Sequence, residues 1–401
     1  MIELVVDGIS SNAEGVARDD SGRVVFVHGA IPGDVVEAEV TTEHKRFARA
    51  SLERVLQASP QRRTPPCLHR LQGCGGCGLQ HATPEGQRDL KMRMVRDALQ
   101  RIGRIEGPDL IFGGGVSPAG YRTTVRAGVV DGRAGFREHR SHELVATPGC
   151  IVAHPTLREL MAEGRFPDAT GVFMRVGHDP EDCVAVVDPA RSGSSTPRGR
   201  LVGREEVPAT DLAAVEERVR NRSFRVSANS FFQSGPAAAD LLVGTVDSLL
   251  DRTDRRGALV DLYTGVGLLV GLVEFDGRRI GVEHSRTAVG DARVNLTDLE
   301  VSVVETPVET WVPEQADVAI ADPSRAGLGR RGVEVVASTR AADLVLVSCD
   351  AGALGRDAGL LTSAGFHLQS CTVLDLFPET SHVEVVSHFT RSEGENRPSS
   401  P

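Results

Sequence analysis

The chain has 401 residues, of which 40% are hydrophobic and 25% charged, and its formal net charge is −10. This length exceeds what one hydrophobic core usually organises, and the composition is that of globular proteins, so a single small domain, a disordered chain and a collagen-like chain are excluded. No apolar run approaches the roughly 20 residues of a membrane span, and the first residues lack a basic region followed by an apolar stretch. We therefore expect a cytoplasmic protein with no membrane partner.

Charge is unevenly distributed along the chain. Residues 45–104 contain 13 lysines and arginines but only four acidic residues, so the remainder is more acidic than the average. A net charge of −10 disfavours a nucleic-acid partner, whereas a locally basic segment can favour one. The preference for arginine over lysine is also what genome composition alone would produce, and this is the simpler explanation of it.

Residues 1–58 are typical of a small β-barrel. Short runs rich in β-branched residues, at 2–6, 23–27, 35–40 and 50–56, are separated by glycine and proline turns. The stretch SGRVVFVHGAIPGDVVEAEV resembles the TRAM module, a small barrel that binds RNA. A barrel without a ligand is the alternative.

Residues 59–225 are expected to form a middle domain. A linker rich in proline and arginine leads into a cysteine-rich stretch, after which leucines and methionines at helical spacing predict a helix over 84–101 with a cationic outer face. Residues 121–152 alternate like a small sheet, and the low-complexity stretch 191–199 predicts a loop.

Four of the seven cysteines are candidate metal ligands: Cys67, Cys74 and Cys77 in CLHRLQGCGGCGLQH, and Cys150 in ATPGCIV. Cysteines of a cytosolic protein more often bind metal, act in catalysis or are buried than form disulfides. Glycines between them let neighbouring thiolates converge on one centre, which fits either a tetrahedral zinc ion or an iron–sulfur cluster. The remaining Cys183 and Cys371 are expected to be buried small hydrophobic residues.

Residues 226–391 alternate between short apolar strands and helices, which predicts a largely parallel sheet covered by helices. Strand 258–262 runs into the glycine turn DLYTGVG, and Glu283 ends the next strand, 22 residues after Asp261. Such glycines let an adenine-bearing ligand approach the backbone, and the acid can accept hydrogen bonds from ribose hydroxyls. This pattern alone also fits a dinucleotide enzyme. Residues 392–401 are expected to form a disordered tail.

The motifs DLYTGVG, GVE and DPSRAG occur in the order seen in class I methyltransferases, and they resemble the S-adenosylmethionine-binding motifs of the RNA 5-methyluridine methyltransferases. The FFQ at 231–233 matches that family's F-x-Q. The chain departs from the family pattern at four positions, which are Thr264, Leu268, Gly235 and Ser324. By position, the resemblance implies that the cofactor is contacted by Gln233, Tyr263, Gly265, Gly267, Glu283 and Asp322.

Two further stretches, SCDAGALGRD and DLFPETSHVE, resemble the family's nucleophile and base motifs, which implies Cys349 as nucleophile and Glu384 as base. Asp350 stands where the family has Asn. Carbon 5 of uracil becomes nucleophilic toward a methyl donor when a thiolate adds to carbon 6, and a carboxylate must then remove the carbon 5 proton so that the cysteine can leave. An inert buried cysteine is the alternative for Cys349, and a supporting role is open to His382.

The pattern C-x6-C-G-G-C-x2-Q-H resembles the four-iron cluster site of the same family, which more often spaces its first pair by five residues. The resemblance implies a [4Fe-4S] cluster on Cys67, Cys74, Cys77 and Cys150, with zinc as the alternative.

The expectation is therefore an α/β protein of the TRAM-containing, iron–sulfur RNA 5-methyluridine methyltransferases. It would combine an N-terminal OB-like TRAM barrel (1–58), a small cluster-bearing α+β middle domain (59–225) and a Rossmann-like class I methyltransferase domain (226–391). We expect a monomer that transfers methyl from S-adenosylmethionine to carbon 5 of a uridine in 23S ribosomal RNA. Transfer RNA as substrate, cytosine-5 methylation and non-catalytic RNA binding are the alternatives. Three arginines, Arg122, Arg126 and Arg325, are candidates for RNA phosphate, although solvated arginines are the commoner case.

Overall fold

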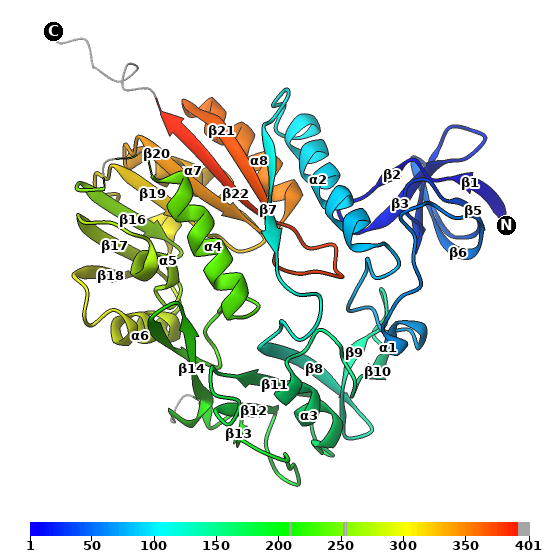
Figure 1. Ribbon diagram of the computed structural model, residues 1–401, viewed down its shortest axis with the longest axis horizontal. Coiled ribbons are helices and arrows are strands. Elements are labelled where there is room, and N and C mark those ends of the chain that lie inside the picture. Colours follow the sequence, from blue (N-terminus) through cyan, green and yellow to red (C-terminus); the bar gives the residue numbers. More distant parts are fainter. Residues whose placement is uncertain (208–210, 252, 254, 392–401) are drawn as a thin grey trace.

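The computed structural model describes residues 1–207, 211–251, 253 and 255–391, so the predicted tail at 392–401 lies outside the described residues. Figure 1 shows a curled sheet at the N-terminal end, a second sheet in the green segment of the chain, and a large sheet that extends to the C-terminus. No helix among the described residues is both long and apolar enough to cross a membrane.

The N-terminal sheet has six strands, and its interior is apolar because alternate residues of each strand point inward. In sheet order the strands are β1 (Ile2–Val5), β5 (Val35–Glu43), β6 (Phe47–Gln57), β4 (Val24–His28), β3 (Glu14–Arg18) and β2 (Gly8–Ile9). Val25, Val27, Val36 and Ala38 are fully buried in its core. The four predicted strands are present, whereas β2 and β3 were missed because they are short and contain glycine.

The middle sheet also has six strands. In sheet order they are β10 (Leu144–Ala146), β9 (Arg133–Arg137), β8 (Thr124–Val130), β11 (Gly171–Val176), β12 (Cys183–Asp188) and β13 (Arg200–Gly203). The sheet predicted over 121–152 supplies half of these strands, and helix α3 (Pro155–Glu163) packs against β9 and β11. A short helix, α1 (Leu68–Leu71), follows Cys67, and the hairpin of β14 (Ala214–Val219) and β15 (Arg222–Ser227) leads to the large sheet.

The large sheet has eight strands and a Rossmann-like arrangement, as predicted. In sheet order they are β18 (Val301–Glu305), β17 (Arg278–Glu283), β16 (Ala258–Leu262), β19 (Val318–Ala321), β20 (Asp343–Ser348), β22 (Glu384–Arg391), β21 (Phe366–Asp375) and β7 (Leu110–Gly115). All neighbouring pairs are parallel except those that β22 makes with β20 and β21. The antiparallel strand β22, which lies third from one edge between β20 and β21, distinguishes this order from the all-parallel dinucleotide fold, in which six strands run 3-2-1-4-5-6.

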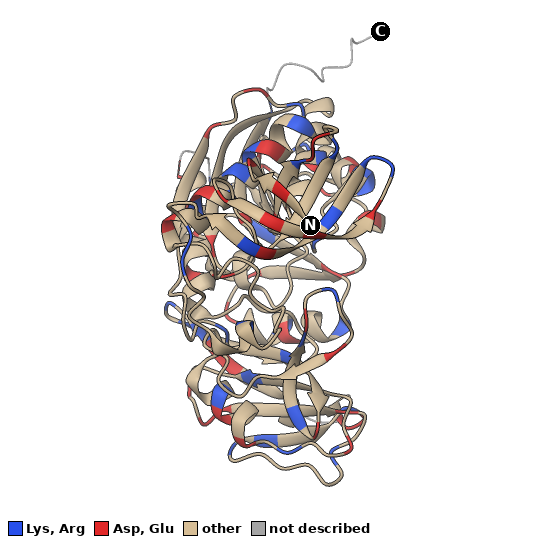
Figure 2. Ribbon diagram, turned by 90° about the vertical axis from the view of Figure 1, so that its right-hand side faces the viewer, with Lys and Arg blue, Asp and Glu red and all other residues tan. Residues whose placement is uncertain are grey.

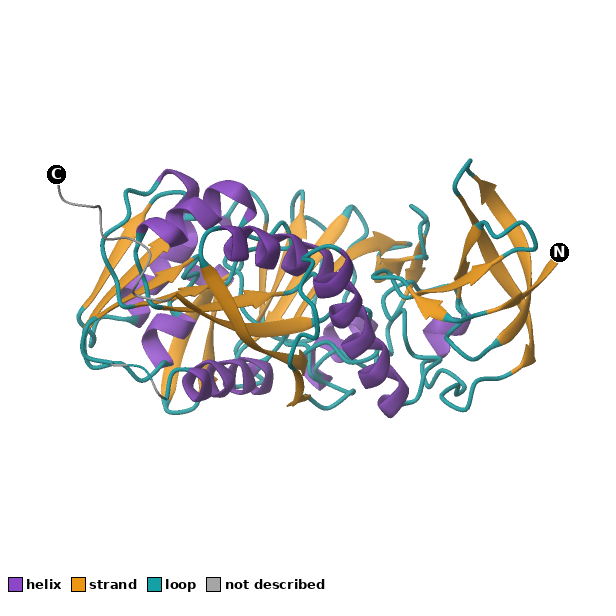
Figure 3. Cartoon of the chain, turned by 90° about the horizontal axis from the view of Figure 1, so that it is seen from above, coloured by secondary structure: helices purple, strands orange, loops and turns teal. Residues whose placement is uncertain are grey.

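Helices cover both faces of this sheet, as the view from above shows (Figure 3). They are α4 (Pro236–Leu249), α5 (Leu268–Leu272), α6 (Arg286–Asn295), α7 (Gly329–Ser338) and α8 (Ala351–Ser363). Strand β16 illustrates why two layers form, because Val260 and Leu262 lie in one apolar core and Leu259 lies in the other. Two short 3₁₀ turns lie at Asp211–Ala213 and Val308–Thr310.

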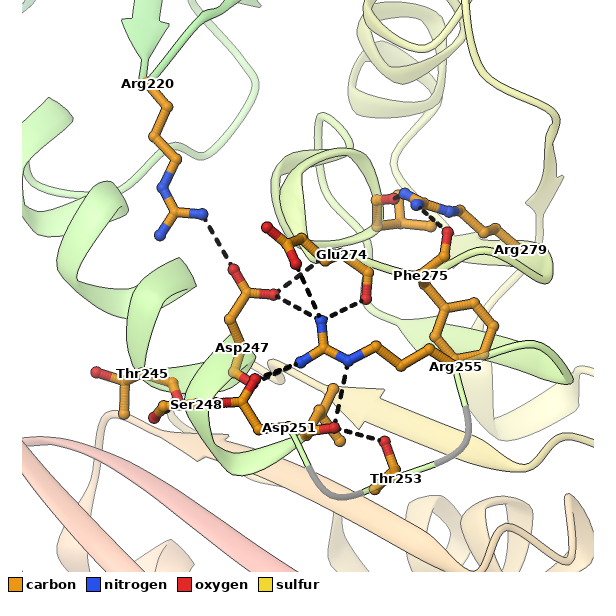
Figure 4. Close-up of polar contacts among 12 residues, drawn as sticks. Arg220, Thr245, Asp247, Ser248, Asp251, Thr253, Arg255, Glu274, Phe275 and Arg279 are labelled. Carbon is orange, nitrogen blue, oxygen red and sulfur yellow. Dashed lines mark hydrogen bonds and ion pairs between the residues drawn. The ribbon is translucent and has the colours of Figure 1, made fainter.

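An ion-pair network fastens the end of α4 to the loop before β17 (Figure 4). The Arg255 guanidinium donates to the Asp251 carboxylate over 2.8 Å and to the Glu274 carbonyl oxygen over 3.0 Å. The Asp247 carboxylate accepts hydrogen bonds from the Arg220 guanidinium and from the Glu274 amide. This network joins elements around the large sheet, and it contains none of the predicted site residues.

Two elements from the expected middle domain pack on the large sheet instead of on the middle one. Helix α2 (Pro84–Arg101) has the predicted bounds and packs against α8, with Val95 and Leu99 in the core of the large sheet. Strand β7 pairs in parallel with β21. Lys91, one of the basic residues of the segment 45–104, is fully buried and does not belong to the outer face of this helix. The domain division at 58/59 and 225/226 remains a prediction.

The basic segment 45–104 is less positive at the surface than its sequence suggests. At least seven of its 13 cations form ion pairs, including Arg49 with Glu14, Arg54 with Glu37 and Arg62 with Asp34. Figure 2 accordingly shows lysines and arginines interspersed with acidic residues over the face that carries the N-terminal sheet. Exposed cations without an ion pair in the described chain include Lys45 and Arg46, on the hairpin between β5 and β6.

Candidate active site

A pocket of about 50 Å³ lies at the carboxyl ends of β16 and β19, where open α/β sheets bind ligands. Four residues predicted to contact the cofactor line it, namely Gln233, Tyr263, Gly265 and Asp322. Gly265 has φ +58 with open space beside it, a backbone conformation that glycine adopts without strain. The two remaining predicted residues, Glu283 and Gly267, do not line the pocket and instead contact the turn that borders it.

Glu283 ends β17 and is held by the turn itself, because its carboxylate accepts from the Gly265 amide over 3.0 Å and from the Ser285 amide over 2.7 Å. Gly267 is the N-cap of α5 and has φ +92, and a side chain there would meet Leu296 at 2.9 Å. Glu283 and Gly267 therefore fix the loop that borders the pocket.

Asp261 is a pocket residue that the sequence motif did not single out for a role. Its carboxylate is buried and accepts from the Thr264 hydroxyl over 2.6 Å and from the Val270 amide over 3.1 Å. Burial raises the pKa of Asp261 to about 7 and also that of Asp322 to about 7. Gln233 donates its amide to Asp322 over 3.4 Å. The pocket thus concentrates acid groups that a cationic ligand would favour in their ionised form.

A second pocket, of about 90 Å³, contains Cys349, which lies between the end of β20 and the start of α8. Burial is the main cause that raises the pKa of this thiol to about 12, followed by the negative charges of Glu384 and Asp322, while Arg325 lowers it. Glu384 opens β22, is 3% exposed, and has its pKa raised well above the usual value by burial and by Asp322. The structure therefore brings together Cys349, Glu384 and Asp322.

His382, for which the sequence left a supporting role open, lies in the loop before β22, two residues ahead of the strand that Glu384 begins. Its Nε2 is 3.1 Å from an Arg325 guanidinium nitrogen, and burial together with Arg325, Arg122 and Lys91 lowers its pKa to about 4. A neutral imidazole that accepts from arginine is a poor proton acceptor for a reaction near pH 7. The structure therefore places His382 beside Arg325 as its hydrogen-bond acceptor in the nucleophile pocket.

The segment 375–384, which leads to Glu384, is anchored by residues far away in sequence that the sequence motifs did not reveal. Lys91 donates to the Asp375 carboxylate over 2.6 Å and to the Phe377 carbonyl over 3.0 Å. Arg63 bonds both carboxylate oxygens of Glu379 at 2.7 Å. Because Glu379 is buried and has φ +71, this loop takes a conformation that its own sequence does not favour and that α2 and the linker stabilise.

The four candidate cysteine ligands line a single pocket of about 270 Å³. Burial raises the pKa of Cys77 to about 12, with further contributions from the three other cysteines. Backbone amides of Val152 and Ala153 lower the pKa of Cys150, and the Gly76 amide lowers that of Cys74, against the larger effect of burial. In the described part of the chain no group of three or more His, Cys, Asp or Glu side chains is arranged to hold a metal ion. What is present is a set of four thiols around one cavity, with amides directed at two of them, which is the donor chemistry of an iron–sulfur or zinc centre.

The three arginines considered for RNA differ in their surroundings. Arg122 packs over the rings of Tyr121 and Phe377, at 5.7 and 5.8 Å. Arg126 is exposed over Phe173, and Arg325 is exposed at the nucleophile pocket. Only these last two present their guanidinium groups to solvent.

Two departures from the family motifs have a structural reason. A side chain at Gly235 would meet the Tyr121 carbonyl oxygen at 2.4 Å, so the close approach of these segments requires glycine. Asp350 caps α8, because its carboxylate accepts from the Ala353 amide over 2.8 Å, as the amide oxygen of Asn also would. Cys183 and Cys371 are fully buried, as expected.

Comparison with known proteins defines the class first. The TRAM domain matches residues 1–52. An uncharacterized RNA methyltransferase of Streptomyces avermitilis is 35% identical over 96% of this chain and 97% of its own length. The chain belongs to the TRAM-containing RNA methyltransferases and is an S-adenosylmethionine-dependent enzyme.

Two further similar proteins have names that specify the RNA and the base that they methylate. The 23S rRNA (uracil(1939)-C(5))-methyltransferase RlmD of Halomonas elongata is 31% identical over 95% of this chain and 88% of that protein. The crystal structure of Pyrococcus abyssi tRNA (uracil-54, C5)-methyltransferase in complex with S-adenosyl-L-homocysteine superposes with a TM-score of 0.72 at 22% identity, covering 97% of this chain and all of the other. The second similarity concerns the fold alone.

Proposed function

We propose that this enzyme methylates carbon 5 of a uridine in RNA, with Cys349 as the nucleophile and Glu384 as the base. The observation that carries the proposal is the position of Asp322. It lines the cofactor pocket, and its charge raises the pKa of both Cys349 and Glu384. The cofactor pocket and the nucleophile pocket are therefore adjacent, as transfer of a methyl group between two bound molecules requires.

The cofactor site consists of Gln233, Tyr263, Gly265 and Asp322, with Glu283 and Gly267 shaping the turn. When bound, S-adenosylmethionine supplies an electrophilic methyl group on a positively charged sulfur. Tyr263 stands at φ +65 and donates its hydroxyl to Glu309 over 2.9 Å, so its ring is held at the edge of the pocket. Asp261 and Asp322 supply the negative charge that complements a cationic ligand.

Cys349 begins the reaction on the RNA. Its thiol is protonated near pH 7 in the ligand-free chain, because burial and two carboxyls raise its pKa. Transfer of that proton to solvent water gives a thiolate, whose electron pair forms the bond to carbon 6 of uracil while the carbon 5–carbon 6 π electrons move toward carbon 5 and its carbonyl. Arg325 is the cationic neighbour that favours the thiolate.

Glu384 ends the reaction. After carbon 5 has taken the methyl group it still carries its proton, and the Glu384 carboxylate accepts that proton. The electron pair of the broken C–H bond reforms the carbon 5–carbon 6 double bond, and the Cys349 thiolate leaves. A carboxylate whose pKa is raised by burial and by Asp322 is a stronger proton acceptor than a solvated one.

We further propose ribosomal RNA as the substrate, because the relative that resembles this chain in sequence at 31% identity acts on 23S ribosomal RNA, whereas the transfer RNA enzyme shares the fold at 22%. The TRAM domain at 1–52 supports an RNA partner of either kind. The polypeptide would act as a monomer.

The four-cysteine pocket is proposed to hold a [4Fe-4S] cluster on Cys67, Cys74, Cys77 and Cys150, with zinc as the alternative. The support is the thiol set and the amides directed at Cys74 and Cys150. Methyl transfer needs no electron transfer, so the proposed role is to hold together segments 67–77 and 150 beside the loop that contains His382, which also lines this pocket.

The test is methyl transfer in vitro. The purified chain is incubated with labelled S-adenosylmethionine and either unmodified 23S ribosomal RNA or unmodified transfer RNA, and the labelled nucleoside is identified after digestion. The proposal predicts 5-methyluridine from ribosomal RNA. Label in 5-methylcytidine would overturn uracil specificity, label from transfer RNA alone would overturn the choice of RNA, and no label in either RNA would contradict the proposal as a whole.

A further inference from the structure

The pocket that contains Cys349 is lined by residues from three separate parts of the chain. Arg325, Asp350 and the loop 381–383 come from the large sheet, and Met94 comes from α2. Ser11 and Asn12 come from the turn between β2 and β3 of the N-terminal sheet. The RNA-binding module therefore contributes to the wall of the pocket proposed for the target base.

Hydrogen bonds fix the conformation of this turn. The Ser10 amide donates to the Glu14 carbonyl over 2.9 Å, and the Glu14 amide donates to the Ser10 hydroxyl over 3.1 Å. Ala13 has φ +58, is buried, and donates its amide to the Ser10 carbonyl over 3.0 Å. The Glu14 carboxylate is in turn bound by Arg49, so the base of the turn is tied to β6.

Apolar packing attaches the turn to the catalytic part of the molecule. Ile9 and Ala13 share a buried core with Leu79, Leu90 and Met94. Helix α2 carries the last two of these residues and packs against α8, the helix that follows Cys349. The turn and the nucleophile are thus connected by packed elements, and their relative position is set by the folded core instead of by a free linker.

The side chains of Ser11 and Asn12 are exposed and make no hydrogen bond within the described chain. An asparagine amide offers one acceptor and two donor hydrogens, and a serine hydroxyl offers both functions. The polar groups of a flipped pyrimidine and of its ribose also include donors and acceptors. Two side chains without hydrogen-bond partners in the described chain, on a hydrogen-bonded turn that lines the nucleophile pocket, suit such a ligand.

We propose that Ser11 and Asn12 contact the target nucleotide directly, so that the N-terminal domain completes the target pocket in addition to holding flanking RNA. This inference rests on the proposed function, because it takes the Cys349 pocket as the site of the target uridine. Direct contact with the target nucleotide and general RNA binding predict different results. If the contact is direct, loss of these side chains should slow the chemistry on bound RNA more than it weakens RNA binding.

The experiment uses a 23S ribosomal RNA transcript in which 5-fluorouridine replaces uridine, together with S-adenosylmethionine. Fluorine at carbon 5 cannot be removed as a proton by Glu384, so the bond between Cys349 and carbon 6 persists after methyl transfer. The rate of adduct formation at saturating RNA reports events in the target pocket, and the dissociation constant of the same RNA reports binding. Both are measured for the full-length wild type, for Asn12→Ala and for the double variant Ser11→Ala with Asn12→Ala.

Loss of one or two hydrogen bonds to the nucleotide should slow adduct formation about 10-fold in Asn12→Ala and further in the double variant, with an RNA dissociation constant within about twofold of wild type. Asn221→Ala, on the hairpin between β14 and β15, changes the same residue type outside this pocket and should match the wild type. A double variant with the wild-type adduct rate, or one that loses only RNA affinity, would overturn the inference. If the wild type itself forms no adduct at Cys349, the proposed function is wrong and the inference falls with it.

Discussion

Two thiols in this enzyme, Cys349 and Cys77, share a pKa shift whose main cause is burial, but they have different ionisable neighbours. Burial raises the pKa of each to about 12. The next causes are the carboxyls Glu384 and Asp322 for Cys349, but the thiol Cys150 for Cys77. A thiol beside acids can act with them on one substrate, whereas a thiol among thiols is suited to share a positive centre. The identity of the neighbours, and not the size of the shift, distinguishes the proposed nucleophile Cys349 from the proposed metal ligand Cys77.

The largest expected effect concerns Cys349, the proposed nucleophile. Cys349→Ala removes the group that adds to carbon 6, so carbon 5 is not activated and methyl transfer should fall by at least about 1,000-fold. Labelled methyl incorporation into unmodified 23S ribosomal RNA measures it. Cys183→Ala, at a fully buried cysteine of the middle sheet, is the control and should retain activity. Persistent methylation by the Cys349 variant would refute the nucleophile assignment.

The second prediction concerns Cys77 and the three other proposed metal ligands. Anaerobic purification of the wild type should yield a brown protein with about four iron atoms per chain. Cys77→Ser removes one of four ligands and should lower the bound iron to a minor fraction, while Cys371→Ser should leave it unchanged. Iron content and the visible absorption spectrum are the readouts. Stoichiometric zinc in the wild type, or no metal at all, would contradict the cluster proposal.

The third prediction concerns Lys91, which stabilises the loop before Glu384. Burial lowers the pKa of Lys91, and its bonds to Asp375 and the Phe377 carbonyl compensate for that burial. Lys91→Met leaves Asp375 without its partner, which should cost about 3–5 kcal/mol of stability and lower kcat about 10-fold through misplacement of Glu384.

Thermal unfolding and a separate measurement of RNA affinity distinguish positioning from binding for Lys91→Met. RNA affinity should stay close to wild type, and Asp375→Asn in the same chain should restore part of the stability because it removes the unpaired charge. Lys45→Met, at an exposed lysine, is the matched control. A normal kcat in Lys91→Met would show that the ion pair does not position the base.

The smallest expected effect is a pH dependence of Cys349 itself. Because its thiol pKa is raised to about 12, alkylation by iodoacetamide should be slow at pH 7 and rise about tenfold per pH unit toward alkaline pH. Glu384→Gln removes a negative charge that raises this pKa, so the thiolate fraction and the alkylation rate should increase several-fold at pH 9. Mass spectrometry of the Cys349 peptide measures the rate, and Glu305→Gln is the control. A slower reaction in Glu384→Gln would mean that the carboxyl activates the thiol instead of opposing its ionisation.

Local sequence patterns predicted much of the fold, and the assignment of the central site residues stays a prediction. Strands at 258–262 and 344–348 follow from short apolar runs, and the bounds of α2 follow from helical spacing and from Pro84 at its start. The motif resemblance predicted Cys349 and Glu384, and the structure brings them together. These features depend on residues close in sequence.

Features that depend on contacts between distant segments escaped prediction. An apolar run does not reveal its direction, so nothing in 384–391 indicated that β22 runs antiparallel. A lysine on a helix is expected to face solvent, and only the contacts of Lys91 with Asp375 and Phe377 explain its burial. The approach of Ser11 and Asn12 to the Cys349 pocket likewise follows from the packing of the barrel on α2.

The central claim is that methyl transfer passes through a covalent bond from Cys349 to the RNA, which Glu384 later releases. The most direct measurement is the mass of the Cys349 peptide after Glu384→Gln enzyme has reacted with unmodified 23S ribosomal RNA and labelled S-adenosylmethionine. The account predicts a methylated uridine fragment that stays attached to Cys349, because elimination stalls when the base is absent. Free 5-methyluridine produced at the wild-type rate, with no adduct on Cys349, would contradict it.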